Sequence, residues 1–204
     1  MSTAVSTATH AAPLELPGVA PAAPKRQLFV GTAVACVGGS ALVAGMLAIW
    51  VLLRERALDS GVERFPLDYI IHEVATNVML MTIWAICLFA QWAVYSGSRG
   101  DRSHTGLALG VTGVLAVAFL NAQAFTWSQM GVEIQDEGYG ALFYAMTGTL
   151  FAIGVVGLLY TVIAAFRALA GNLANTDVLT AHALFWYWAA AAYSAIWFVV
   201  YVTK

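Results

Sequence analysis

Hydrophobic residues are gathered into five long runs, separated by short polar segments that hold most of the charges. The runs cover about residues 28–53, 69–95, 105–127, 139–166 and 180–202. Each run is long enough for a helix to cross the roughly 30 Å hydrocarbon core of a bilayer. Backbone amides in lipid need partners within their own segment, which favours helices. The pattern therefore predicts an all-α, polytopic membrane protein built as a bundle of five transmembrane helices.

The composition agrees with a membrane protein. Hydrophobic residues make up 61% of the chain and charged residues only 10%, whereas ordinary soluble domains carry about 25% charged residues. Residues 1–27 are rich in Ala, Pro, Ser and Thr and hold no apolar core of signal-peptide length. We therefore expect a flexible cytoplasmic tail over 1–27 and a transmembrane domain over 28–204. The net charge of −2 gives no indication of a nucleic-acid partner.

The basic residues of the flanking segments predict the orientation. An N-terminus on the inside places five basic residues on the inner side: Lys25, Arg26, Arg99, Arg102 and Arg167. The outer side then holds four: Arg54, Arg56, Arg64 and Lys204. Because cytoplasmic loops carry an excess of Lys and Arg, this distribution favours an N-inside, C-outside topology.

Polar side chains interrupt the second and third runs, and they are the first candidates for a functional cluster: Glu73, Thr76, Asn77, Asn121, Gln123 and Thr126. Antiparallel neighbouring helices place them at similar depth, so Gln123 can reach the face that carries Glu73 and Asn77. Asn121 lies about 200° from Gln123 around the helix and must face another helix or another subunit. We interpret these groups as interhelical hydrogen bonds, each contributing about 0.6–2 kcal/mol. A chemical site and a lipid-headgroup contact are the alternatives.

Glu73 is the only acid within a run. An acid in this place is a candidate for proton transfer or ion binding. The milder interpretation is that Glu73 favours the start of its helix electrostatically and reaches the headgroup region. It also begins a stripe on one helical face, which we expect to point towards protein. The stripe consists of Glu73, Asn77, Leu80, Trp84, Cys87 and Gln91.

Small and aromatic residues suggest how the helices pack. Three sets of small residues recur at helical spacing: Gly31, Ala35, Gly38, Gly45 and Ala48; Ala141, Ala145, Gly148 and Ala152; and Ala189, Ala192 and Ala195. Such faces let helices approach closely in lipid. Aromatic residues near the ends of the runs are expected to anchor the helices at the membrane interface. They are Trp50, Tyr69, Trp92, Tyr95, Trp127, Tyr139, Trp186, Trp188 and Tyr201.

Residues that could carry redox or catalytic chemistry are scarce. His72 and His182 open the second and fifth runs at opposite sides, about 30 Å apart, too far to ligate one haem. Cys36 and Cys87 are expected to pack as small hydrophobic residues. The chain contains no phosphate loop, nucleophile elbow or zinc-protease motif. The sequence therefore indicates no catalytic residue and no cofactor or metal bound by this chain.

Several stretches, in order, resemble subunit III of the haem–copper (cytochrome c) oxidases in its five-helix bacterial form. They are "GGSALVAGMLAIWVLLR", "NVMLMTIWAICLFAQWAV", "SGSRGDRSHTGLALG", "AFLNAQAFTW", "GYGALFYAMTGTLFAIGV" and "ALFWYWAAAAYSAIWFVVYV". The framework residues that match the family include Ser40, Gly45, Trp127, Thr147, Gly148 and Trp186. Family acids and histidines are replaced by Ala41, Thr126, Leu150, Ile153, Tyr187 and Ala190. The resemblance therefore indicates a divergent member.

The resemblance implies an accessory, non-catalytic subunit of a bacterial terminal oxidase, embedded in the plasma (inner) membrane. Such a subunit would stabilise the catalytic subunit I, hold membrane lipids and support proton uptake, with haem and copper in the partner subunits. Two alternatives stay open. One is an accessory subunit of a nitric oxide reductase, and the other is a stand-alone small transporter or sensor.

Overall fold

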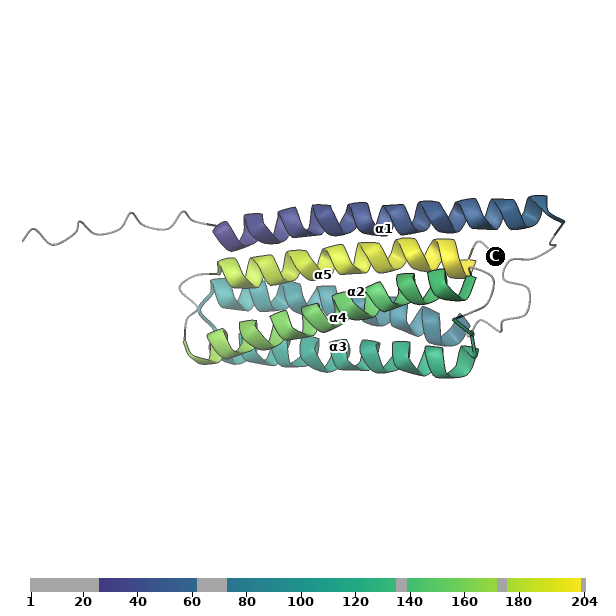
Figure 1. Ribbon diagram of the computed structural model, residues 1–204. Helices are drawn as coiled ribbons and strands as arrows, with labels where there is room; N and C mark the ends of the chain where they lie inside the picture. The colour runs from purple at the N-terminus through teal and green to yellow at the C-terminus, as the bar shows by residue number, and fades with distance from the viewer. Residues whose placement is uncertain (1–25, 62–72, 135–138, 172–175, 203–204) are drawn as a thin grey trace, which may run out of the picture.

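The computed structural model describes residues 26–61, 73–134, 139–171 and 176–202. These residues form five long helices (Figure 1), and each is long and apolar enough to cross a membrane. The helices are α1 (Gln27–Asp59), α2 (Glu73–Ser98), α3 (Arg102–Met130), α4 (Tyr139–Leu169) and α5 (Asp177–Ile196). A π-helical segment, η1 (Trp197–Val202), continues α5. The predicted all-α bundle of five transmembrane helices is therefore confirmed.

The helices run past the ends of the hydrophobic runs. α1 begins at Gln27, inside the segment expected to be tail, and continues to Asp59, which makes it 33 residues long. Thirty-three residues span about 50 Å, more than the hydrocarbon core of a bilayer. α3 begins earlier than its run, where Asp101 caps it, and ends at Met130, after which the C-cap Gly131 has a φ of 59°. Helical hydrogen bonding continues into the headgroup region. Hydropathy therefore predicts where a helix crosses the membrane more accurately than it predicts the residues at which the helix begins and ends.

α5 lies at the centre of the helix packing. It contacts α1, α2 and α4, while α3 lies between α2 and α4 on the side away from α1. Figure 1 shows α1 along one edge of the bundle, next to α5. Large side chains fill the centre, and the largest fully buried ones include Trp50, Phe119, Phe143, Trp186 and Tyr193. α1 is therefore the helix with the least cover from its own chain.

The two ends of the bundle differ in charge. At the end where α1 begins lie Arg26, Arg99, Arg102 and Arg167, and we name it the arginine end. At the other end, where α1 finishes, lie Glu55, Asp59, Glu73 and Glu133, together with Arg54 and Arg56, and we name it the acidic end. The arginine excess at the end nearest the N-terminus agrees with the N-inside topology, which stays a prediction.

Several aromatic residues expected at the membrane interface are instead buried between helices. Trp50, Tyr139, Trp186 and Tyr201 are exposed by 1%, 6%, 0% and 6%, so the prediction was wrong for them. The rings of Trp50 and Tyr139 lie 5.2 Å apart where α1 passes α4. These residues lie on helix faces that neighbouring helices cover, which a position near a run end does not reveal. Among the others, Tyr95 is exposed, and Tyr69 lies outside the described residues.

Of the predicted small-residue faces, one points into the bundle and the others point outwards. On α5, Ala189 and Ala192 are buried. On α1, an ideal Cβ at Gly31, Gly38 or Gly45 would meet no atom within 4 Å. α1 rests on α5 through a different face, which carries the buried residues Thr32, Cys36, Val43 and Trp50. On α4, Ala141, Ala145 and Ala152 are likewise exposed. The faces predicted for helix packing on α1 and α4 therefore point away from their own bundle.

The start of α3 is held by a carboxylate whose protonation should weaken it. The Asp101 Oδ1 atom accepts from the His104 backbone N–H at 3.0 Å, and Oδ2 lies 2.6 Å from His104 Nδ1. These hydrogen bonds, the backbone one first, lower the pKa of Asp101 below its ordinary value. Stability from a lowered pKa is present above the ordinary value and is lost as the pH falls through the folded one.

We therefore expect Asp101→Ala to lower the thermal unfolding midpoint near neutral pH. The gap between the variant and the unmodified chain should close as the pH falls below about 4. Thermal unfolding in detergent at a series of pH values measures this. A gap that stays constant down to acid pH would show that the carboxylate charge does not hold the helix start.

Candidate functional site between α2 and α5

The stripe predicted on α2 faces α5 and forms hydrogen bonds along the contact. Trp84 Nε1 donates to Ser194 Oγ at 3.2 Å, and the Tyr187 hydroxyl donates to Gln91 Oε1 at 3.2 Å. Between them, the Cys87 thiol donates to a backbone carbonyl of α5 at 3.4 Å.

The stripe is only partly covered by α5. Cys87 is buried, whereas Trp84 is 49% exposed and Glu73, Asn77 and Gln91 are also exposed. The stripe follows the edge of the α2–α5 contact and not its centre, so its outer atoms face the surroundings of the bundle. The prediction that the stripe points towards protein therefore holds for the atoms that form hydrogen bonds with α5. It does not hold for the exposed parts of the same side chains.

At the acidic end this contact opens into a pocket of about 260 Å³ between α2 and η1. Its lining consists of Glu73, Thr76, Asn77, Trp197, Tyr201 and Val202. Trp197 Nε1 donates to Asn77 Oδ1 at 3.1 Å, which joins the two walls. Beneath it, the Tyr193 hydroxyl donates to the Thr76 carbonyl at 3.1 Å. The structure thus brings together Glu73, Thr76 and Asn77, half of the predicted polar cluster, and adds residues of a π-helix, a structure frequent at functional sites.

The other half of the predicted cluster does not join this pocket. Thr126 is fully buried, and its hydroxyl donates to the Ala122 carbonyl at 2.9 Å and lies 3.9 Å from Met79 Sδ. Asn121 is exposed on the opposite face of α3, as the predicted 200° separation requires. Gln123 is buried, but its amide nitrogen has no hydrogen-bond partner. The expected hydrogen bond from Gln123 to Glu73 or Asn77 is therefore absent, and that prediction was wrong.

The unpaired amide decides the expected effect of replacing Gln123. A buried amide without a partner costs about 1–3 kcal/mol, so Gln123→Leu should leave the free energy of unfolding unchanged or raise it by about that amount. Thermal unfolding of both chains in the same detergent tests this. Thr126→Val is the comparison. The Thr126 hydroxyl already forms a hydrogen bond, so removing it removes no unpaired polar group and should not raise the free energy of unfolding. A clear loss of stability in Gln123→Leu would mean that the amide has a partner.

The family framework residues have defined structural roles where their side chains touch another helix. Trp127 Nε1 donates to Thr147 Oγ1 at 3.0 Å, joining α3 to α4. Ser40 Oγ accepts from Trp188 Nε1 at 2.9 Å, joining α1 to α5. Gly45 and Gly148 leave open space, since a Cβ there would meet nothing within 4 Å. The remaining framework residue, Trp186, belongs to a buried cluster.

The sequence pattern did not reveal this buried cluster, which lies in the half of the bundle nearer the arginine end. Thr161 Oγ1 lies 2.8 Å from His182 Nε2 and accepts from Trp186 Nε1 at 3.1 Å. The Thr161 hydroxyl itself donates to the Gly157 carbonyl at 2.8 Å. His182 is fully buried, and Nδ1 has no partner. With the proton on Nε2, every donor in the cluster is satisfied and only an acceptor lone pair on Nδ1 stays open.

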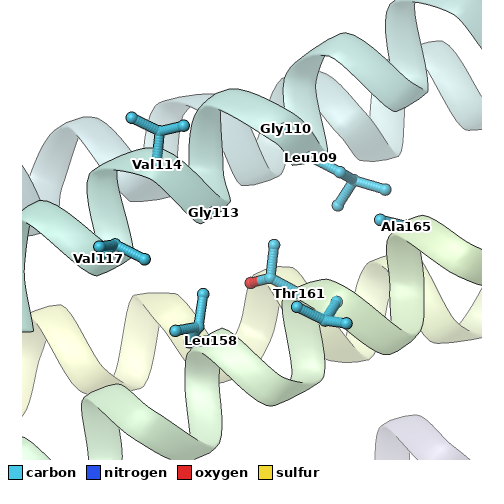
Figure 2. Close-up of a pocket in the computed structure, with 9 residues that line it drawn as sticks. Leu109, Gly110, Gly113, Val114, Val117, Leu158, Thr161 and Ala165 are labelled. Carbon is cyan, nitrogen blue, oxygen red and sulfur yellow. The ribbon is translucent and has the colours of Figure 1, made fainter.

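An apolar groove lies on the other side of Thr161, between α3 and α4 (Figure 2). It has a volume of about 440 Å³. Its lining includes Gly110, Gly113, Val117 and Leu158, and the missing side chains of the two glycines leave the space open. Because the Thr161 hydroxyl is already engaged, the groove offers an apolar surface and no free hydrogen-bonding group.

In the part of the chain that the structure describes, no three His, Cys, Asp or Glu side chains come together to hold a metal ion. His182 belongs to no such group, and His72 lies outside the described residues. Among the buried polar groups, Thr147 joins α3 to α4 and Thr161 joins α4 to α5.

Comparison with known proteins points to one family. A family model described as cytochrome c oxidase subunit III matches residues 69–204, which include α2 to α5. The Bos taurus protein named cytochrome c oxidase subunit 3 is 30% identical over 112 residues, which are 55% of this chain and 42% of that protein. The Prototheca wickerhamii protein of the same name is 29% identical over 97 residues, 48% of this chain and 37% of that protein.

The matched segment spans less than half the length of these curated relatives. The family model, by contrast, covers well over half of the present chain, and its match falls on four of the five helices of the bundle. The identities to these relatives are low, at 30% and 29%. The chain belongs to the cytochrome c oxidase subunit III family, as a divergent member.

Proposed function

We propose that this chain is an accessory, non-catalytic subunit of a bacterial terminal oxidase in the plasma membrane. In this role it stabilises the catalytic subunit I and supports proton uptake there, while haem and copper reside in the partner subunits. The observation that carries the proposal is the family match over residues 69–204. The hydrogen bonds between helices support it further, because they describe a scaffold held together by its polar groups.

The surface of α1 is the docking face that this role requires. Gly31, Gly38 and Gly45 recur every seven residues, and no atom of the chain lies within 4 Å of their Cβ positions. Large apolar side chains flank them, including Val34 and Val37, which are 67% and 71% exposed. Helices in lipid associate through such small-residue faces because their backbones can approach closely. We propose that a transmembrane helix of the catalytic subunit lies on this face.

The stand-alone transporter is the alternative from another class, and one observation favours it. It requires a water-accessible cavity at Glu73, and Glu73 does line a pocket. That pocket, however, is built from the first turns of α2 and from η1, all at the acidic end. A transport path has to cross the membrane, so the pocket supports binding at one end better than transport.

Purification in mild detergent followed by mass spectrometry tests the proposed role. We expect haem-bearing oxidase subunits to be recovered with the chain, while the chain separated from them carries no haem absorption. Recovery of nitric oxide reductase subunits would instead favour the other accessory role. Recovery of the chain by itself, from membranes that contain intact oxidase, would contradict both accessory roles.

A further inference from the structure

We propose that the outward face of α3 is an interface through which two copies of this chain pair in the membrane, with their Asn121 carboxamides hydrogen-bonded to each other. The proposal goes beyond the oxidase role and does not need it. α3 lies on the side of the bundle away from α1 (Figure 1). α1 can therefore contact the catalytic subunit while α3 contacts a second copy.

A heptad pattern runs along the outward face of α3. Exposed residues follow one another at steps of four and three, and we name this set the α3 seam: Gly110, Val114, Val117, Asn121, Ala124 and Ser128. Val114 and Val117 are 70% and 53% exposed. The buried residues of α3, such as Ala116 and Phe119, lie on the other side of the helix. Steps that repeat every seven residues are the pattern by which two helices pack along a shared seam.

Asn121 is the residue of the seam that does not suit lipid. Its side chain is exposed, and no residue in the described part of the chain forms a hydrogen bond with its carboxamide. The other polar group of the seam, the Ser128 hydroxyl, donates to the Phe125 carbonyl at 2.7 Å within α3. An amide without a partner is costly in an apolar environment.

The depth of Asn121 makes this cost unavoidable within one chain. Asn121 lies five residues from Ala116, the middle of α3, which is about 7.5 Å along the helix axis. The boundary of the hydrocarbon core is about 15 Å from its centre. Asn121 therefore lies well inside the hydrocarbon, where water does not reach it, and its partner has to come from another chain.

A second copy of this chain meets the requirement. Copies inserted in the same direction are related by a twofold axis along the membrane normal, which brings equal depths together. A carboxamide has both donors and an acceptor, so two Asn121 side chains at one depth satisfy each other. The seam also places Val114, Asn121 and Ser128 at the first heptad position, a. A single Asn at an a position is the residue that fixes register and strand number when two helices pair.

The groove between α3 and α4 supplies a hole that such pairing fills. In two-stranded packing, each side chain at the first or fourth heptad position enters a hole formed by four residues of the facing helix. For Val114 of the second copy, the four are Gly110, Gly113, Val114 and Val117. All four line the groove (Figure 2), and Leu158 of α4 adds an apolar wall. A Cβ at Gly110 would meet no atom within 4 Å, so the hole is open to a side chain from outside.

Energy transfer between labelled full-length chains in phosphatidylcholine vesicles tests the pairing. Donor and acceptor fluorophores are attached to the N-termini, and transfer is measured as the protein-to-lipid ratio rises. We expect transfer to rise to a plateau, with the dependence on acceptor fraction that a dimer gives. Asn121→Leu should lower the association constant about tenfold, because it removes hydrogen bonds between helices in lipid. Asn121→Gln keeps the carboxamide and should keep the association.

Gln91→Leu is the matched control for Asn121→Leu. It also removes a carboxamide from an exposed position, but Gln91 Oε1 accepts from the Tyr187 hydroxyl of its own chain. Its association constant should equal that of the unmodified chain. Absence of transfer from the unmodified chain at every ratio would overturn the proposal, as would equal weakening by Asn121→Leu and Gln91→Leu.

Cysteine cross-linking locates the interface independently of Asn121. Val114→Cys places a thiol on the seam, and Leu88→Cys places one on the outward face of α2. The two positions are 70% and 69% exposed, whereas the native Cys36 and Cys87 are buried. Oxidation with copper phenanthroline in the native membrane should link Val114→Cys chains to each other and leave Leu88→Cys chains single. Links through Leu88→Cys in place of Val114→Cys, or links from Val114→Cys only to a different protein, would overturn the proposal.

Discussion

Replacing Gly38 by leucine should detach the chain from its oxidase partner and leave the five-helix bundle folded. Gly38 lies on the outward face of α1, where a Cβ would meet no atom of the chain within 4 Å. A leucine there raises helix propensity by about 1 kcal/mol, but it prevents another helix from approaching the backbone closely. We expect the amount of oxidase subunits recovered with the chain to fall roughly tenfold or more, a loss of about 1.4 kcal/mol of association free energy. Quantitative mass spectrometry of the purified complex measures it.

The matched control for this variant is Gly110→Leu. Gly110 also has open space around its Cβ position, but it lines the groove between α3 and α4. If the partner docks on α1, Gly110→Leu should leave the recovery of oxidase subunits unchanged. Loss of the partner from the Gly110 variant alone would place the docking face on α3 and α4, and the assignment to α1 would be abandoned.

Replacing Gly157 by alanine should destabilise the bundle by about 1–3 kcal/mol, the usual cost of adding atoms to a filled core. An ideal Cβ at Gly157 would lie 2.7 Å from Trp186 Cζ2 and 3.0 Å from Phe185 Cε1. Trp186 is fully buried and its Nε1 donates to Thr161 Oγ1, so its ring is held in place. The thermal unfolding midpoint in detergent should therefore fall.

Gly148→Ala, on the same helix, serves as the comparison. A Cβ at Gly148 would meet no atom within 4 Å, and alanine stabilises a helix interior by about 1 kcal/mol relative to glycine. We expect its midpoint to stay equal or to rise. Midpoints that move in the same direction in both variants would show that helix propensity, and not the contact with Trp186, governs the effect at Gly157.

The fold was predictable because lipid restricts the possible structures. Five long apolar runs, in which Glu73 is the only acidic residue, can cross a bilayer only as helices, and the helices are found where the runs are. The burial of Cys36 and Cys87 followed in the same way from residue type. The exact helix ends did not follow, because α1 and α3 continue past the apolar residues into polar ones.

The candidate site was predictable only in part. Periodicity placed Glu73, Asn77 and Gln91 on one face of α2, and that face does form hydrogen bonds to α5 and η1. The same reasoning paired Gln123 with Glu73 or Asn77, because adjacent helices and equal depth were the only guides. The rotation of α3 instead leaves the Gln123 amide nitrogen buried without a partner. Depth follows from the sequence, whereas rotation about the helix axis depends on the packing of every neighbour.

The sequence by itself determined that this protein is a five-helix membrane bundle, and which residues lie on one face of each helix. These properties are local, since hydropathy and a period of 3.6 residues fix them. Only the tertiary structure decided which faces meet. It placed α5 at the centre, turned the α1 glycines outwards, and joined Thr161, His182 and Trp186 across two helices. In lipid, small and apolar faces can pack against a helix of the same chain, a partner or lipid itself, so side-chain fit between helices makes that choice.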